Sequence, residues 1–132
     1  MKQTPKKILI IEDESMLLEA LSENFTELGY VVTGCPDAQT AFDHMQEDKP
    51  DIILTDLVLP NIDGFEILRT LQQSVHLSDI PVLVLSNLAE PTDIKKAKDL
   101  GAHDFLVKAQ MALSEIVERV EKELETGDKK EK

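Results

Sequence analysis

Five short apolar runs recur along the chain with no polar residue inside them. They are ILII at 8–11, YVV at 30–32, IIL at 52–54, VLVL at 82–85 and FLV at 105–107. Unbroken apolar runs of this length are typical of strands that are covered on both faces, as in a parallel sheet. The pattern therefore predicts five buried strands.

The segments between these runs have the apolar spacing of amphipathic helices. Gly29 is predicted to end the first helix, and Asp37 to cap the second. The fifth helix carries a strong apolar stripe, whereas the fourth has only Ile94, Ala97 and Leu100 and should pack most lightly. Strands that alternate with helices predict a doubly wound α/β domain, because right-handed crossovers place helices on both faces of one sheet.

The length of 132 residues, of which 42% are apolar, is that of one domain with a single packed unit. We expect the domain to span residues 1–126 and a flexible C-terminal tail to span residues 127–132, beginning at Gly127.

The charge and the cysteine content limit the possible partners and the compartment. A net charge of −12 disfavours direct DNA binding and contact with anionic membranes. The N-terminus is too poor in apolar residues for a signal peptide or a membrane span. Cys35 is the only cysteine, so no intramolecular disulfide can form; we expect a buried thiol and a cytoplasmic protein.

Polar residues follow four of the five predicted strands. Ligands of open parallel sheets bind beyond the carboxyl ends of the strands, so these residues should converge at one edge. Each of them taken alone has an ordinary explanation, such as a helix cap, a turn, a loop hydroxyl or a solvated charge. Together, the carboxylates require a cation. The residues are Glu12, Asp13 and Glu14 after the first strand, Asp56 after the third, Ser86 and Asn87 after the fourth, and Lys108 after the fifth.

This set has a specific chemistry. The carboxylates of Asp13 and Asp56, with Glu12 acting through water, are suited to Mg²⁺. A carboxylate beside Mg²⁺ can attack a phosphoryl group. Lys108 and the Ser86 hydroxyl would then supply positive charge and a donor to the phosphoryl oxygens. Asp56 is therefore a candidate phosphoacceptor.

Four motifs of the chain resemble those of one known protein family. ILIIEDE at 8–14, DLVLPNIDG at 56–64, VLVLSN at 82–87 and GAHDFLVK at 101–108 occur in the order and at the spacing of that family. Over residues 5–125 the chain resembles the receiver domain of response regulators in two-component signalling. The resemblance implies a flavodoxin-like parallel sheet of strand order 2-1-3-4-5 with five helices.

The resemblance also implies a role for each matching residue. Asp56 would accept a phosphoryl group from a sensor histidine kinase, a phosphotransfer protein or a small phosphodonor. Asp13 would bind Mg²⁺ directly and Glu12 through water, and the backbone carbonyl of Val58 would complete the protein ligands. Lys108 would pair with the phosphoryl group.

The expected output is a conformational switch. Ser86 would turn toward the phosphoryl group, and Phe105 would move inward as the aromatic switch residue. The face formed by the fourth helix, fifth strand and fifth helix would then control an effector protein or a second receiver. On the fourth helix, Lys95, Lys96 and Lys98 form a basic cluster that is either a docking surface for an acidic partner or an ordinary solvated face.

The chain departs from the family pattern at several positions. Glu12 replaces the commoner aspartate, and Phe105 replaces the frequent tyrosine. Asn87 stands where the family has a very small residue, and we expect it to narrow access to Asp56. Ala109 replaces a proline whose peptide is often cis, so the Lys108–Ala109 peptide is expected to be trans or strained.

Four further positions concern the loop after the third strand and the lifetime of the phosphoryl group. Pro60 and Gly64 match the family's loop around the site. Val58 and Leu88 are apolar at positions where rapidly dephosphorylating receivers tend to carry polar groups. Because apolar side chains cannot orient water, we expect slow self-hydrolysis.

Alternative functions remain open at this point. One is a pseudo-receiver that uses the fold for interactions alone. Another is a phosphatase or phosphotransferase with an aspartyl-phosphate intermediate, which the missing acid two residues after Asp56 disfavours. We expect no enzymatic activity beyond the protein's own phosphorylation and dephosphorylation. A stand-alone receiver and a piece of a longer regulator are both compatible with the sequence.

Overall fold

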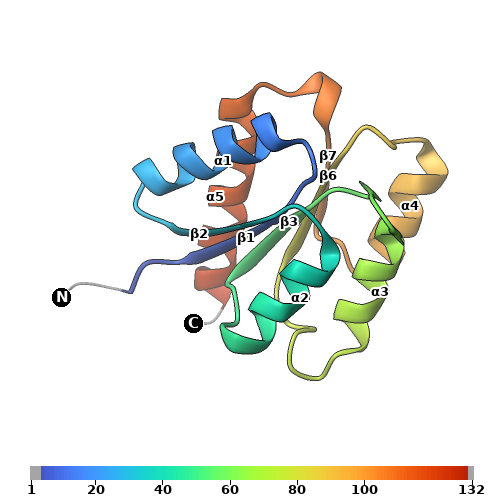
Figure 1. The fold of residues 1–132 in the computed structure, drawn as a ribbon, viewed down its shortest axis with the longest axis horizontal. Helices are drawn as coiled ribbons and strands as arrows, with labels where there is room; N and C mark the ends of the chain where they lie inside the picture. The colour runs from blue at the N-terminus through green and yellow to red at the C-terminus, as the bar shows by residue number, and fades with distance from the viewer. Residues whose placement is uncertain (1–3, 131–132) are drawn as a thin grey trace.

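A five-stranded parallel sheet forms the centre of the computed structural model, which describes the backbone of residues 4–130 and the side chains of residues 4–126. Its order is β2-β1-β3-β6-β7, which is the predicted 2-1-3-4-5 order of a flavodoxin-like fold (Figure 1). The strands are β1 (Lys7–Ile11), β2 (Val31–Cys35), β3 (Ile52–Thr55), β6 (Val82–Ser86) and β7 (Asp104–Val107).

Five helices cover both faces of this sheet (Figure 1), so each face has its own core. Phe25 and Ile116, from α1 and α5, pack on one face, and Met45, Ile67 and Ala97, from α2, α3 and α4, pack on the other. The doubly wound architecture is therefore confirmed. The helices are α1 (Ser15–Glu27), α2 (Ala38–Glu47), α3 (Gly64–Gln73), α4 (Pro91–Asp99) and α5 (Leu113–Lys130).

The helix boundaries follow from local chemistry. Gly29 adopts a φ of 98° directly after the end of α1, a conformation that glycine adopts without strain. The Asp37 carboxylate caps α2 by accepting a hydrogen bond of 2.8 Å from the Thr40 N–H. Both boundaries agree with the sequence predictions. Cys35 is fully buried, as expected, and burial raises the pKa of its thiol to about 11.

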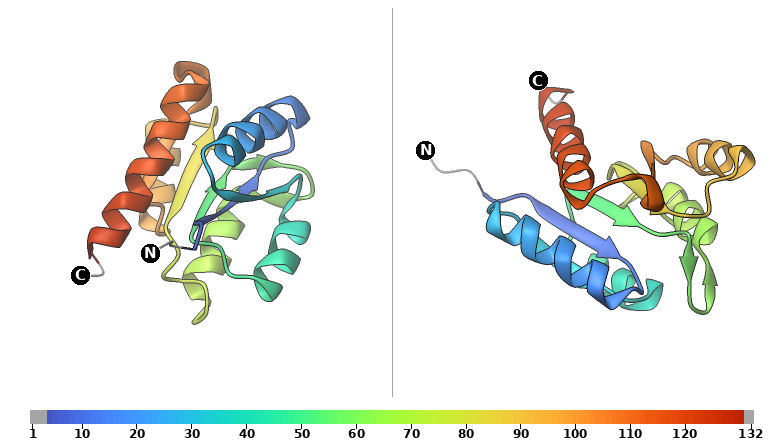
Figure 2. Two further views of the ribbon diagram at one scale, coloured as in Figure 1. Left: turned by 90° about the vertical axis from the view of Figure 1, so that its left-hand side faces the viewer. Right: turned by 90° about the horizontal axis from the view of Figure 1, so that it is seen from above.

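Two strand predictions were incomplete. β2 continues to Cys35 because Thr33 and Gly34 pair with β1 through backbone groups, which do not require apolar side chains. A small antiparallel hairpin, β4 (Val58–Leu59) and β5 (Ile62–Asp63), follows β3 and was not predicted. The right-hand view of Figure 2 shows this hairpin, in green, beyond the end of β3.

The C-terminal helix is longer than predicted. α5 continues through Gly127 to Lys130, so residues 127–130 are helical in backbone, and the flexibility expected of residues 127–132 stays a prediction. A glycine inside a helix costs about 1 kcal/mol relative to alanine, which neighbouring helix-forming residues can offset. The last two residues of the expected tail, 131–132, lie outside the described part of the chain. Within residues 4–130, no helix has the length and apolarity needed to cross a membrane.

The fourth helix packs lightly, as the sequence predicts. Ala97 is the one buried residue within α4. α5, on the other face, buries Ile116, Val117, Val120 and Leu124. Because buried apolar area is the main source of packing energy, α4 is held less firmly than α5.

Candidate functional site

Asp56 lies directly after β3 and is 4% exposed. Its Oδ1 accepts hydrogen bonds from two backbone N–H groups, those of Leu57 at 2.6 Å and Val58 at 3.1 Å. Its own N–H donates to the Ile11 carbonyl of β1 at 3.1 Å. The backbone of β1 and of the following turn therefore fixes the Asp56 carboxylate and leaves Oδ2 facing other groups.

Lys108 directly follows β7, and its side chain contacts Asp56. Its Nζ lies 2.7 Å from Asp56 Oδ2 and 2.9 Å from a carboxylate oxygen of each of Glu12 and Glu14. The Lys108 side chain is only 9% exposed. Burial by itself would lower the pKa of Lys108, but the hydrogen bonds to Asp56, Glu14 and Glu12 outweigh it and raise that pKa above the ordinary value. Lys108 is therefore a charged ammonium among three carboxylates.

Glu12 is almost fully buried at the end of β1. Its Oε2 accepts a hydrogen bond from the Glu14 N–H at 3.0 Å. Its Oε1 makes no hydrogen bond of good geometry within the described residues, although Lys108 Nζ lies 2.9 Å away. Burial raises the pKa of Glu12, and the Glu14 N–H and Lys108 oppose this effect. A buried carboxylate oxygen in this position favours a cation beside it.

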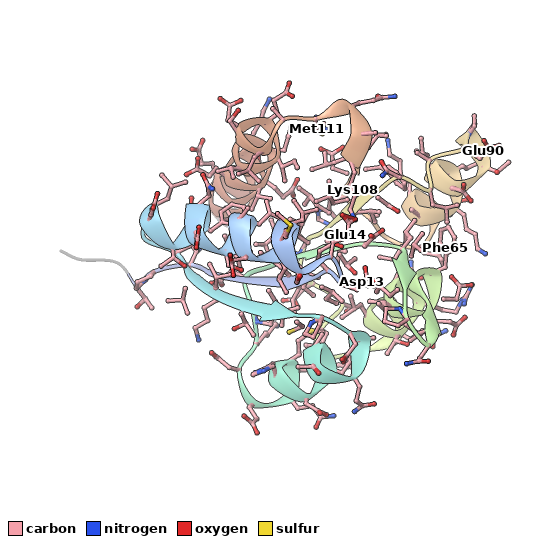
Figure 3. The ribbon with its side chains drawn as sticks, turned by 45° about the horizontal axis from the view of Figure 1, so that its top comes forward. Asp13, Glu14, Phe65, Glu90, Lys108 and Met111 are labelled. Atoms are coloured by element: carbon pink, nitrogen blue, oxygen red, sulfur yellow. The ribbon has the colours of Figure 1, made fainter. Side chains whose placement is uncertain are left out.

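Asp13 completes a group of acidic side chains. One carboxylate oxygen from each of Glu12, Asp13 and Asp56 lies within 4.8 Å of the others. Asp13 itself is exposed to solvent. Figure 3 shows Asp13 and Glu14 on the side of the molecule where Lys108 lies. Three hard oxygen donors, one of them open to water, fit Mg²⁺, which keeps several of its waters when bound to proteins.

One side chain, that of Asn87, joins the loops after β6 and β7. Ser86 is fully buried, and its Oγ accepts a hydrogen bond from the Leu88 N–H at 3.2 Å. Asn87 Oδ1 accepts a hydrogen bond of 2.8 Å from the Ala109 N–H. Among residues 4–130 every peptide bond is trans, including the bond between Lys108 and Ala109. The Lys108–Ala109 peptide, which was expected to be trans or strained because alanine replaces proline, is trans.

Gly64 shapes the loop that follows Asp56. Its N–H donates to the Leu57 carbonyl at 3.0 Å. A Cβ at this position would lie 2.3 Å from Leu57 Cα, which no backbone tolerates without moving. Glycine is therefore required here by close approach, and the loop in turn presents the two N–H groups that hold Asp56. In the hairpin within this loop, Val58 is 58% exposed.

The expected switch and docking positions lie on β7 and α4. Phe105, on β7, is partly buried and packs against the core on the α2, α3 and α4 face. Of the three lysines of the basic cluster on α4, Lys95 forms an ion pair of 2.9 Å with Asp99, and Lys96 Nζ lies 4.3 Å from the centre of the Phe65 ring. Two of these charges thus have partners within the fold.

The structure brings Glu12, Asp13, Asp56 and Lys108 together, as the strand ends predict. Ser86 lies at the neighbouring strand end. Two contacts were not predicted. Glu14 pairs with Lys108 although its position in the run EDE gave no separate reason for this role. Asn87 and Ala109 were noted only as departures, whereas an amide side chain and an N–H that proline lacks form a natural pair.

Comparison with known sequences identifies the class. The sequence profile of the response regulator receiver domain matches residues 8–121. The chain therefore belongs to the response regulator receiver domain family, and it is a receiver domain of the two-component type with the acidic pocket described above.

Individual relatives agree with this assignment. The alkaline phosphatase synthesis transcriptional regulatory protein PhoP of Bacillus subtilis is 34% identical over 103 residues, which are 78% of this chain and 42% of PhoP. The receiver domain of a signal transduction histidine kinase from Syntrophus aciditrophicus is 30% identical, with a TM-score of 0.81 over 92% of this chain and 91% of that chain.

A third similar structure is the Mn²⁺-bound form of response regulator Rcp1, which is 27% identical. Its TM-score is 0.80 over 89% of this chain and 92% of that chain. The curated relatives are longer proteins: the chain spans 15% of the gliding motility regulatory protein of Myxococcus xanthus and 42% of PhoP.

Proposed function

We propose that this protein is a phospho-accepting receiver that takes a phosphoryl group on Asp56 with the help of Mg²⁺. One observation carries the proposal: the buried Asp56 carboxylate lies 2.7 Å from the Lys108 ammonium and within 4.8 Å of carboxylate oxygens of Glu12 and Asp13. A carboxylate so placed is positioned between a cation binding site and a fixed ammonium.

The transfer is a displacement at phosphorus. A carboxylate oxygen of Asp56 forms a bond to the phosphorus atom, and the bond from phosphorus to the donor's leaving atom breaks, with its electron pair departing on the leaving group. The N–H groups of Leu57 and Val58 hold the Asp56 carboxylate in place during this step. The Lys108 ammonium is close enough to the Asp56 carboxylate to exchange this ion pair for one with an oxygen of the incoming phosphoryl group.

Mg²⁺ would be held by Asp13, Asp56 and the backbone carbonyl of Val58, with Glu12 acting through water, and it would neutralise charge on the phosphoryl oxygens. The acidic group and the Mn²⁺ in the related Rcp1 structure support this proposal. Among the side chains of residues 4–126, Lys108 is the cation that pairs with Glu12, Glu14 and Asp56.

The switch and its output follow the same reasoning. A phosphoryl group adds about two negative charges at the end of β3. Ser86 and Lys108 would turn toward it, and Phe105 would respond on β7. The light packing of α4 supports a rearrangement of the α4, β7 and α5 face, because switching elements are drawn from the less stable parts of a fold.

The partners we propose are a sensor histidine kinase or phosphotransfer protein upstream and an effector or second receiver downstream. Direct binding of DNA or a membrane is not part of the proposal, nor is catalysis on external substrates, and we propose a cytoplasmic location. On α4, Lys98 is the lysine best placed to meet an acidic partner, because Lys95 and Lys96 already have partners. If the Lys98→Glu variant no longer binds the effector or second receiver while the Lys7→Glu variant still does, the result would support this docking surface. Equal binding of that partner by both variants would exclude it.

The proposal is tested by incubation with Mg²⁺ and acetyl phosphate, followed by intact mass spectrometry. Wild type should gain one phosphoryl group, and Asp56→Asn should gain none. Asp43→Asn, an exposed aspartate on α2, is the matched control and should behave as wild type. An absent adduct in wild type, even with the cognate kinase, would indicate a pseudo-receiver, and turnover of external phosphoesters would indicate an enzyme.

A further inference from the structure

The loops that follow β6 and β7 are tied by one side-chain hydrogen bond. The Ala109 N–H donates to Asn87 Oδ1 at 2.8 Å, between residues 22 positions apart. The backbone ladder between β6 and β7 ends at the pair Ser86 and Val107. The Asn87 contact therefore extends the connection of the two strands by one step, to the point where Lys108 leaves the sheet.

The placement of Lys108 depends on this point. Residues Lys108–Gln110 form a single turn of 3₁₀ helix, closed by a hydrogen bond of 3.3 Å from the Met111 N–H to the Lys108 carbonyl. Ala109 lies within this turn and is exposed. A lysine has a flexible stem of four carbons, so the position of its ammonium depends on how firmly its backbone is held. The Asn87 contact holds that backbone from the neighbouring strand.

Asn87 also stands next to Ser86. The Ser86 hydroxyl accepts from the Leu88 N–H, so residues 86–88 form a short turn with one side chain directed inward and the Asn87 amide directed to Ala109. A movement of this turn changes the hydrogen bond to the Lys108 loop. The contact therefore joins the turn that carries Ser86 to the turn that carries Lys108, which come from neighbouring strands.

The residue type suits this position. An amide oxygen accepts a hydrogen bond without a formal charge, whereas a carboxylate would add a further negative side chain to a site that already contains Glu12, Asp13, Glu14 and Asp56. Alanine would leave the Ala109 N–H to water, and the loop would lose its link to β6.

We propose that Asn87 is a positioning residue for phosphoryl transfer: its amide oxygen fixes the Ala109 N–H, sets the place of the Lys108 ammonium, and couples it to Ser86. This inference rests on the proposed phosphorylation of Asp56 for its functional consequence. The contact itself is independent of that function and is tested separately.

The first experiment measures the contact without any phosphodonor. Amide hydrogen exchange by NMR should show faster exchange at Ala109 in Asn87→Ala, by about five-fold, the ratio expected for the loss of one neutral hydrogen bond. Asn87→Asp keeps an acceptor and should retain the protection of Ala109. Asn24→Ala, which removes a side-chain amide from α1, is the matched control and should leave Ala109 unchanged. Unchanged exchange at Ala109 in Asn87→Ala would overturn the proposal.

The second experiment measures phosphorylation by acetyl phosphate at saturating Mg²⁺. The maximal rate should fall about five-fold in Asn87→Ala, while the half-saturating donor concentration stays the same, because Asn87 acts on the transfer step through Lys108. In a Lys108→Ala background, Asn87→Ala should have no further effect. A faster rate in Asn87→Ala would show that Asn87 obstructs Asp56 and would overturn the proposal, as would an equal five-fold loss in both backgrounds.

The two experiments separate the possible failures. If wild type takes no phosphoryl group, the proposed function fails, and the exchange measurement still decides whether Asn87 holds the Lys108 loop. If wild type is phosphorylated and Asn87→Ala is phosphorylated at the same maximal rate, only the role of Asn87 fails.

Discussion

The acidic half of the site, on β1 and β3, and the cationic half, on β6 and β7, are held by different kinds of contact. Asp56 is fixed by three backbone hydrogen bonds and a loop that requires Gly64. Lys108 instead reaches its place along a flexible stem, from a turn linked to β6 through the Asn87 side chain. The Asp56 carboxylate is therefore held by backbone groups, whereas the Lys108 ammonium is held by side-chain contacts.

The largest effect should come from removing the cation that joins the two halves. Lys108→Ala removes the ammonium that pairs with the buried carboxylates of Glu12 and Asp56, and we expect the free energy of unfolding to fall by about 3 kcal/mol without metal. Urea unfolding measures this change. Mg²⁺ should restore part of the loss, because it supplies positive charge to the same carboxylates.

Lys95→Ala is the matched control for that variant. Its ammonium also lies 2.9 Å from a carboxylate, that of Asp99, but both side chains are mostly exposed, so the loss should stay below about 0.5 kcal/mol. Equal losses of unfolding free energy in the two variants would mean that burial of the Lys108 ion pairs contributes nothing to stability. The contrast between a buried and an exposed ion pair would then be wrong.

Metal binding tests the acidic half by itself. If Asp13, Asp56 and Glu12 form a Mg²⁺ site, metal at 100 times its dissociation constant should raise the free energy of unfolding by about 2.7 kcal/mol. Asp13→Asn should lose most of this increase, since it removes the exposed carboxylate of the group. Thermal unfolding with and without Mg²⁺ provides the measurement. Glu19→Gln, on the exposed side of α1, should retain the full increase; loss in both would indicate non-specific charge screening.

The loop after β3 gives the next effect. Gly64→Ala forces a Cβ against Leu57, and we expect a loss of about 2 kcal/mol in unfolding free energy together with slower phosphorylation, because Leu57 donates to Asp56. Gly34→Ala is the control: its Cβ would meet the flexible Leu18 side chain at 3.1 Å, so phosphorylation should be unaffected. Normal phosphorylation in Gly64→Ala would show that the loop does not position Asp56.

The smallest expected effect concerns the lifetime of the phosphoryl group. Val58 and Leu88 are exposed by 58% and 38% and cannot orient water for attack. In the double variant Val58→Asn, Leu88→Glu we expect the phosphoryl group to be lost about ten-fold faster, equivalent to about 1.4 kcal/mol in the barrier. The decay of the phosphorylated mass over time measures this. If the phosphorylated mass decays at the same rate in the double variant and in wild type, Val58 and Leu88 do not determine the lifetime of the phosphoryl group.

The sequence predicted which strand ends meet better than it predicted the contacts between the loops, and the reason lies in how the residues are connected. Asp56 follows a buried strand, and the acidic run 12–14 follows another, so parallel pairing alone brings them to one edge. The contact of Asn87 with Ala109 depends on two loops whose course the apolar pattern does not specify. The hairpin β4 and β5 was missed for the same reason, since its strands are two residues long and carry no periodic signal.

By itself, the sequence determined the five-stranded doubly wound fold and the edge at which its chemistry lies. Apolar runs and helical stripes are repeated along the chain, and burial of apolar surface leaves few arrangements for them. Only the tertiary structure decided that Glu14 pairs with Lys108, and that the Asn87 side chain accepts a hydrogen bond from the loop that carries Lys108. These contacts link residues far apart in the chain through single polar atoms, whose partners are fixed by distance and direction after the sheet has formed.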